Sequence, residues 1–384
     1  MGRWGTVPVA ARILAVVRTP TALDRLHDVF PALADDVRLE IRFAVAKGSE
    51  FAADLTELLH RQHMRVVKWS KIRAADFDLA ISPSSNGALH KLRIPIMTMP
   101  HGAGHHKKRA TGEGFTDEIS GLSRTQLVHK NRIVPKIIGL SHHNQIDALR
   151  AGCPEAVDRA RVIGDPCFDR LRASIPMRDH YRSGLRSGDR KLVVICSTWG
   201  DRSAYGRQAE LVTRLVEVLP PDHYQVALVL HPNIPAQHSR FMVDLWTRHA
   251  RSRGLVVVPP DRGWRAVLVA ADVVVSDHGS LALYAAALGI PFLLAEFGTD
   301  EIVPGTPAAR LADRAAWLDP TADLRAQVDA ARPVAGHEEL ASDAFSPIGR
   351  SAERLREAIY DAIGLPLPGW PVRAEPVEVF SPDA

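Results

Sequence analysis

A polar turn between two apolar segments carries residue types that suit a bound phosphate. Residues 273–275 are apolar and lead into Ser276-Asp277-His278-Gly279-Ser280, which is followed by a small apolar run and by a second apolar stretch at 291–295. The pattern predicts a strand, a helix and a parallel strand, with the turn at the carboxyl end of a sheet. Backbone N–H groups and the helix dipole favour an anion there. Gly279 permits close approach of the backbone, and Ser280 is the expected N-cap. We interpret the turn as a diphosphate pocket; the alternative is an ordinary capped helix.

Two histidines also follow predicted strands. His101 comes shortly after the apolar segment 94–97, and an imidazole there can act as a general base toward an acceptor hydroxyl. A merely structural or exposed histidine is the alternative. His231 ends the apolar segment 225–230 and precedes Pro232, which stops the strand; its ring can donate to a phosphate oxygen.

Two further segments lie where a predicted strand ends, and a basic run is a separate candidate. Thr198 and Arg202 follow residues 191–197, and an arginine there can hold a phosphate through two hydrogen bonds. The turn at 164–169 is either a rigid turn or part of a substrate site. The basic run 105–109 is either a solvated loop or a contact for a phosphate or lipid headgroup.

Apolar segments of strand and helix length alternate along the chain, which predicts parallel α/β sheets. Strands are expected at 12–17, 38–45, 77–81, 94–97, 137–140, 161–164, 191–197, 225–230, 255–258, 273–275 and 291–295. Helices are expected at 21–29, 50–62, 144–151, 208–218, 239–253, 280–288 and 349–363. The polar, arginine-rich segment 170–190 is the expected domain junction. We predict two Rossmann-like domains facing across a cleft, at 1–175 and 176–365, and an extended or disordered proline-rich tail at 366–384.

Composition excludes several classes of protein. The 384 residues are 46% hydrophobic and 24% charged, with a net charge of +4, which suits an anionic small molecule better than a nucleic acid. No P-loop, GxGxxG or HExxH motif is present, so we expect neither a P-loop nucleotidase nor a usual dehydrogenase, and no metal site. Three scattered cysteines fit a reducing compartment, and no apolar stretch is long enough to span a membrane. We therefore expect a cytoplasmic protein.

In their order and spacing, these segments resemble the CDP-glycerol glycerophosphotransferase family, the teichoic acid primases and polymerases of the GT-B architecture. The resemblance covers about residues 95–300. It rests on the following positions: His101-Gly102, Gly164, Pro166, Asp169, Thr198-Trp199, His231-Pro232, Asp277, Ser280 and Gly289-Ile290-Pro291. It implies a metal-independent transferase that needs no cofactor besides its nucleotide-activated donor, CDP-glycerol or a similar compound.

The resemblance also implies roles for the candidate residues. His101 would be the base that activates the acceptor hydroxyl, and His231 would act with it as a catalytic residue that holds the donor diphosphate. The other donor-binding residues would be Thr198, Arg202, Asp277, His278, Gly279 and Ser280. Preformed donors at a helix N-terminus would stabilise the charge that grows on the leaving nucleotide.

The chain departs from the family pattern at several cationic positions. Cys167 and Gly200 replace motif arginines, and His278-Gly279 stand where the family has Tyr-Ser. Three functions therefore compete: transfer of a polyol-phosphate or glycosyl group in cell-envelope or glycan biosynthesis, a nucleotide-sugar epimerase or hydrolase of the same architecture, and a non-catalytic nucleotide-binding protein. The expected partners are a nucleotide donor and a polyol, glycan or lipid-linked acceptor. If the acceptor is lipid-linked, residues 61–73 are a possible peripheral membrane contact, with a solvated helix edge as the alternative.

Overall fold

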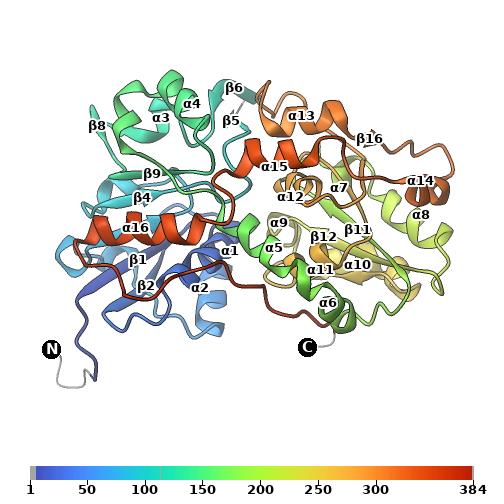
Figure 1. Cartoon of the computed structure of the whole chain (residues 1–384), viewed down its shortest axis with the longest axis horizontal. Coiled ribbons are helices and arrows are strands. Elements are labelled where there is room, and N and C mark those ends of the chain that lie inside the picture. Colours follow the sequence, from blue (N-terminus) through green and yellow to red (C-terminus); the bar gives the residue numbers. More distant parts are fainter. Residues whose placement is uncertain (1–5, 113, 383–384) are drawn as a thin grey trace. The chain divides into compact units, whose positions relative to one another are not determined.

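The computed structural model describes residues 6–112 and 114–382, which form two compact units (Figure 1). The first unit contains the described residues of Met1–His105, Arg109–Asp169 and Phe345–Ala374. The second contains those of His106–Lys108, Arg170–Ala344 and Glu375–Ala384. Each unit is built around its own six-stranded sheet.

The first sheet is parallel and has the strand order β10-β9-β4-β3-β1-β2. Its strands are β1 (Ala11–Val17), β2 (Leu39–Val45), β3 (Leu79–Ser82), β4 (Ile96–Thr98), β9 (Ile137–Leu140) and β10 (Ala160–Val162). Alternate residues of β1 enter two different cores: Ile13 and Ala15 lie in one, and Leu14 and Val16 in the other. A strand covered on both faces must be apolar throughout, which explains the continuous hydrophobic runs in the sequence.

Helices and two small hairpins complete the first unit. Its helices are α1 (Pro20–Val29), α2 (Ala52–Arg61), α3 (Arg124–Leu127), α4 (Gln145–Gly152) and α16 (Ser351–Ile363), with 3-10 turns η1 (Phe30–Leu33), η2 (Trp69–Lys71), η3 (Ala74–Asp76), η4 (Leu89–Lys91) and η5 (Pro154–Arg159). The hairpins are β5 (Lys108–Thr111) with β6 (Gly114–Ile119), and β7 (Val128–His129) with β8 (Arg132–Ile133).

The second sheet is also parallel and has the order β13-β12-β11-β14-β15-β16. Its strands are β11 (Lys191–Ser197), β12 (Tyr224–Leu230), β13 (Val256–Val257), β14 (Val273–Ser276), β15 (Phe292–Leu294) and β16 (Ala316–Trp317). From β11 the chain builds outward through β12 and β13, then returns to add β14 on the other side. This is the Rossmann order, with its topological switch between β11 and β14.

Helices of the second unit alternate with these strands. They are α6 (Arg178–Gly184), α7 (Ala204–Arg207), α8 (Glu210–Val218), α9 (Asn233–His238), α10 (Arg240–Ser252), α11 (Trp264–Ala270), α12 (Ser280–Ala287), α13 (Pro307–Arg314), α14 (Leu324–Ala330) and α15 (His337–Phe345), with the turn η6 (Ile175–Met177). The expected strand–helix–strand unit is confirmed as β14, α12 and the parallel β15. Gly289, with φ of +72°, follows the end of α12, as a left-handed C-terminal glycine does.

The last helix returns to the first unit. Figure 1 shows α16, in red, beside the first sheet, and Leu355 and Ile359 lie in the same core as β1. Asp169 holds its start, because its carboxylate accepts from the N–H of Gly349 at 2.6 Å and from the N–H of Ser351 at 2.9 Å. Residues 345–364, expected in the second domain, thus pack in the first unit.

The segment expected to be the domain junction is helical rather than turn-rich, and it belongs to the second unit. Residues 170–190 contain the end of α5 (Pro166–Ser174) and all of α6, although a polar junction was expected there. Leu171, Tyr181 and Leu185 are each at most 2% exposed, so a few buried side chains hold helices whose surface is arginine-rich. The units divide after Asp169, close to the expected boundary between 175 and 176.

The tail is extended and ordered by its contacts. Residues 365–382 form no helix or strand. Val377 and Phe380 are buried, and the backbone of Val377 donates to Ser174 Oγ at 2.9 Å and accepts from Tyr181 Oη at 2.8 Å. In the part of the chain that the structure describes, no helix is both long and apolar enough to cross a membrane.

Candidate functional site

The candidate donor site lies at the carboxyl ends of β11 and β14 in the second unit. These strands are neighbours on either side of the topological switch. In open α/β sheets the connections diverge at such a point and leave room for a ligand. The loop after β11 carries Thr198 and Arg202, and the turn after β14 carries Asp277, His278, Gly279 and Ser280. The structure therefore brings these six predicted residues to one edge of one sheet.

Asp277 joins the two loops. Its side chain is 0% exposed, and its two carboxylate oxygens accept from the N–H groups of Thr198, Ala204 and Gly279 and from Ser197 Oγ, at 2.9–3.1 Å. With every oxygen engaged by protein donors, this side chain positions the loops and turns no oxygen toward solvent. Asp277 thus fixes where α12 begins relative to the end of β11.

The N-cap of α12 is Gly279, and the expectation that Ser280 fills this position is wrong. Gly279 has φ of −71° and ψ of 166°, and Ser280 is the first helical residue. A Cβ atom on Gly279 would lie 3.2 Å from both Asp277 Oδ1 and Thr198 Cβ, so a side chain would press on the loop contact. Ser280 is half-exposed, and its hydroxyl makes no hydrogen bond to another described residue. A free hydroxyl and the first N–H groups of α12 therefore lie side by side.

His278 is a buried link to a third segment. Its side chain is 0% exposed; Nδ1 accepts from the N–H of Gly298 at 3.0 Å, so the neutral ring carries its proton on Nε2, which donates to Glu301 at 3.1 Å. Lys107 also pairs with Glu301, at 3.2 Å. Burial alone would raise the pKa of Glu301, but the hydrogen bond from His278 and the Lys107 ammonium outweigh it and lower the pKa to about 2. His278 thus links the turn at 276–280 to the segment that contains Gly298 and Glu301.

His231 follows β12, the other neighbour of β11. Its Nδ1 accepts from the N–H of Asn233 at 3.1 Å, so the neutral ring carries a proton on Nε2 and can donate it to an anion. Trp199, which is 53% exposed, has its ring 6.2 Å from this imidazole. Pro232 follows as the N-cap of α9, which begins at Asn233.

Two buried polar atoms near these strand ends were not predicted from the sequence. Ser276 Oγ and Asn233 Oδ1 have no hydrogen-bond partner within residues 6–112 and 114–382. Both follow or end a strand of the second sheet, beside Asp277 and His231 respectively. Buried polar groups are normally satisfied, so these atoms are suited to a ligand or a bound water. The signal in the sequence was their place at a strand end, which periodicity alone does not single out.

Arg202 already has a carboxylate partner. Its Nη1 lies 2.5 Å from Asp300, whose side chain is 67% exposed. An ion pair this exposed is worth about 1 kcal/mol or less, so an incoming phosphate can compete for the guanidinium.

In the first unit, a buried ion pair holds the loop that carries His101. Arg25, on α1, donates to both oxygens of Asp165 at 3.0 and 3.2 Å and to the carbonyl oxygen of Gly102 at 2.6 Å. Both charged side chains are at most 2% exposed, while His101 is exposed. The sequence predicts a turn at Asp165 but contains no signal for its partner Arg25, which lies 140 residues away along the chain.

The basic run 105–109 is neither a simple solvated loop nor a row of free cations. His105 and His106 are each 8% exposed, Lys107 pairs with Glu301, and Arg109 pairs with Glu118 at 2.5 Å. His105 Nδ1 donates to the carbonyl oxygen of Ser120 at 2.9 Å. Burial and the nearby His101 lower the pKa of His105 to about 4, although the contact with Ser120 acts in the opposite direction.

This pKa predicts that the first unit loses stability in mild acid. Between about pH 6.5 and 4 the unfolded chain binds a proton at His105 that the folded chain does not bind. The free energy of unfolding therefore decreases as the pH is lowered through that range. The full effect is about 3 kcal/mol. We expect His105→Gln to flatten the pH dependence of the denaturation midpoint, measured from pH 7 to 4.5. His60→Gln, at an exposed site on α2, is the control; equal slopes in both variants would contradict the assignment.

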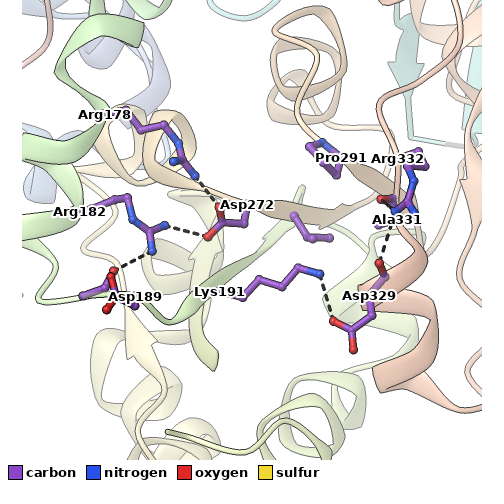
Figure 2. Close-up of a pocket in the computed structure, with 11 residues that line it drawn as sticks. Arg178, Arg182, Asp189, Lys191, Asp272, Pro291, Asp329, Ala331 and Arg332 are labelled. Carbon is purple, nitrogen blue, oxygen red and sulfur yellow. Dashed lines mark hydrogen bonds and ion pairs between the residues drawn. The ribbon is translucent and has the colours of Figure 1, made fainter. Parts of the chain in front are cut away.

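A separate pocket lies at the opposite edge of the second sheet. It has a volume of about 560 Å³, and Figure 2 shows its charged lining. Lys191 begins β11 and Asp272 precedes β14, so this is the amino-terminal edge of the strands. Arg178 and Arg182 both pair with Asp272, at 2.6 and 2.7 Å, and Lys191 pairs with Asp329. Arg178, Arg182 and Lys191 are thus each paired with a carboxylate of the protein, although the two arginines share Asp272. None of the predicted donor-site residues lines this pocket.

The described residues contain no cluster of side chains suited to a metal ion. Within residues 6–112 and 114–382, no group of three or more His, Cys, Asp or Glu side chains is arranged to hold a metal ion.

Comparison with solved structures shows the same fold in three proteins. The wall teichoic acid polymerase TagF matches 93% of this chain and 90% of its own, with a TM-score of 0.59 and 11% identity. The alignment with MnaA of S. aureus, solved with UDP, covers 96% of this chain and 100% of MnaA, with a TM-score of 0.54 and 12% identity. Anabaena Alr3699/HepE, solved with UDP and glucose, matches 92% and 99%, with a TM-score of 0.50 and 13% identity.

These similarities confirm the expected fold class, α/β with two Rossmann-like domains of the GT-B type. No family model and no curated protein matches the sequence. At 11–13% identity the likeness concerns the fold, so the activity must be argued from the site.

Proposed function

We propose that this protein is a transferase that moves a glycosyl or polyol-phosphate group from a nucleotide-diphosphate or CDP-activated donor to a hydroxyl acceptor. The observation that carries the proposal is the start of α12 at the topological switch, where the Ser280 hydroxyl adjoins the first N–H groups of the helix. Asp277 fixes this turn by accepting from the N–H of Gly279, the N-cap. Such an arrangement binds a diphosphate and stabilises its growing negative charge. Similar folds solved with UDP support a nucleotide ligand.

Each candidate residue has a role in this proposal. Ser280 and the N–H groups of the first turn of α12 hold the diphosphate, and Nε2–H of His231 donates to it. Asp277 and His278 act through the loops that they position, because their side chains are buried and engaged. Arg202 exchanges Asp300 for a phosphate oxygen.

The reaction needs a base and a leaving group. The acceptor hydroxyl oxygen attacks the transferred group, its proton passes to His101, and the bond to the nucleotide leaving group breaks with its electron pair on that group's oxygen. An imidazole suits the proton transfer because it titrates near neutral pH. The acceptor, a polyol, a glycan or a lipid-linked form of either, belongs to cell-envelope or glycan biosynthesis in this proposal, with the protein acting from the cytoplasm.

Titration calorimetry with CMP, CDP-glycerol, UDP and UDP-N-acetylglucosamine tests the donor site. We expect one of these ligands to bind with micromolar affinity and Ser280→Ala to weaken it about tenfold or more, because a hydrogen bond to a charged group is lost. Ser252→Ala, an exposed serine on α10, is the control and should leave the affinity unchanged.

The choice of ligand separates the alternatives. A cytidine ligand favours polyol-phosphate transfer, and a uridine ligand favours glycosyl transfer or an epimerase. Tight binding without turnover, with any acceptor offered, would identify a nucleotide-binding protein instead. Binding that is insensitive to Ser280→Ala would remove the proposed pocket.

A further inference from the structure

Helix α10 in the second unit has an apolar face directed away from its core. Its inner face consists of Val243, Thr247 and Ala250, each at most 6% exposed. On the opposite face, Phe241 is 71% exposed and Leu245 is 45% exposed. These two residues are four apart, so they form a single stripe on the outer surface of the helix. An ordinary surface helix places polar residues there.

Aromatic side chains extend this stripe toward neighbouring elements. Trp246 is 42% exposed, and its ring lies 5.2 Å from that of His238 on α9 and 6.3 Å from that of Tyr205 on α7. The patch formed by Phe241, Leu245 and Trp246, here termed the α10 patch, occupies the first two turns of the helix. Exposed apolar patches of this kind mark contacts with a partner or a membrane.

The charges around the α10 patch are predominantly positive. Residues 240–253 contain four arginines and one aspartate. Arg248 lies one turn beyond Leu245 on the same face, and neither Arg248 nor Arg253 has a carboxylate partner among the residues that the structure describes. The other two arginines have acidic partners: Arg251 pairs with Asp244 at 2.5 Å, and Arg240 lies 3.8 Å from Asp261. The surface that surrounds the apolar residues therefore suits an anionic partner.

We propose that the α10 patch docks on an anionic lipid surface. Exposed Phe and Leu on the outer face of a helix, with an exposed Trp at the side of that face and arginines around them, resemble the pattern of helices that lie in the membrane interface. Tryptophan prefers the headgroup level, and arginine heads reach anionic phosphates while their stems cover apolar surface. This inference concerns a surface of the second unit and does not depend on the proposed reaction.

The basic segment 61–73 lacks an outward apolar face. Its cations are exposed, but its apolar residues are turned inward: Met64, Val66 and Trp69 are half-buried and pack against the cores of the first unit. Cations alone give weak, salt-sensitive binding, whereas inserted apolar side chains add to the affinity. We therefore assign the proposed membrane contact to α10 and not to residues 61–73.

Co-sedimentation with vesicles tests the proposal. The full chain is mixed with vesicles of phosphatidylcholine, with and without 30% phosphatidylglycerol (roughly the fraction that produces a strong surface potential). We expect the bound fraction to be larger on the anionic vesicles and to fall at least fivefold in Phe241→Ser/Leu245→Ser. Arg248→Glu should also lower the bound fraction at least fivefold, since one cation near the membrane surface contributes about 1 kcal/mol.

Matched variants make the outcome decisive. Arg61→Glu/Lys68→Glu changes more charge on the other basic segment and should leave vesicle binding within about twofold, by the argument that apolar insertion is needed. Equal binding to neutral and anionic vesicles, or unchanged binding of the α10 variants, would overturn the proposal. So would a concentration-dependent dimer in gel filtration that the α10 variants abolish, without vesicle binding, since the patch would then join two copies. Thermal melting confirms that each variant is folded.

Discussion

His101→Ala is expected to lower kcat for group transfer by about 10²–10⁴-fold while leaving donor affinity within about twofold. The magnitude is the usual contribution of a positioned general base. The split between kcat and affinity follows because His101 lies in the first unit, whereas the residues proposed to hold the donor lie in the second. The measurement is steady-state turnover with the donor that calorimetry identifies, together with a donor titration of the same variant.

The control for this prediction is His60→Ala, at an exposed histidine of the first unit on α2. It should retain full turnover. If His101→Ala also turns over at the rate of the unchanged protein, the proposed base is wrong. If instead the donor affinity collapses with kcat, His101 binds the donor, and the assignment of units to substrates must be reversed.

Arg25→Met is expected to destabilise the first unit by about 3–5 kcal/mol, the usual effect of leaving a buried charge without its partner. Asp165, which is 1% exposed, would lose both of its guanidinium donors, and the carbonyl oxygen of Gly102 would lose a donor at 2.6 Å. The loop of His101 would then lose its anchor, so kcat should fall as well. Denaturant unfolding followed by tryptophan fluorescence, with turnover below the transition, measures both effects.

A paired variant separates charge from packing in this prediction. Arg25→Met/Asp165→Asn removes both charges, and the amide oxygen can still accept from the N–H of Phe168, as Asp165 Oδ1 does at 2.9 Å. We expect less than half of the stability loss in the double variant, because replacing a buried pair as a whole costs little. If the stability loss of the double variant equals the sum of the losses of Arg25→Met and Asp165→Asn, the two side chains are not electrostatically coupled.

Much of the fold was predictable because it is local. The apolar runs that become β1, β11 and β14 are continuous in the sequence, since a strand buried on both faces needs no polar residue. The turn from Ser276 to Ser280 could be placed at a strand end for the same reason. The short edge strand β16 and helix α6 were missed because few buried residues mark them. Helix α5 was missed although Cys167, Phe168 and Leu171 are buried, because Gly164 and Pro166 at its start are residues typical of a turn.

Contacts between distant segments decided how the candidate sites are built. Asp165 meets Arg25 across 140 residues, Asp169 meets Ser351 across 182, and Glu301 meets Lys107 across 194. None of these pairs leaves a periodic signal, because each depends on where the sheets place the ends of separate strands. The same holds for Asp277 and His278, whose residue types suggested ligand contacts but whose burial makes them supports.

The sequence by itself determined the two parallel sheets, the strand–turn–helix at 273–288 and the histidines at strand ends, since these follow from apolar periodicity and from breaks in it. Only the tertiary structure decided that α16 belongs to the first unit, that Gly279 rather than Ser280 caps α12, and that the apolar face of α10 points outward. The physical reason is that burial and hydrogen-bond partners are properties of packed segments, and the identity of a side chain does not state which segment it packs against.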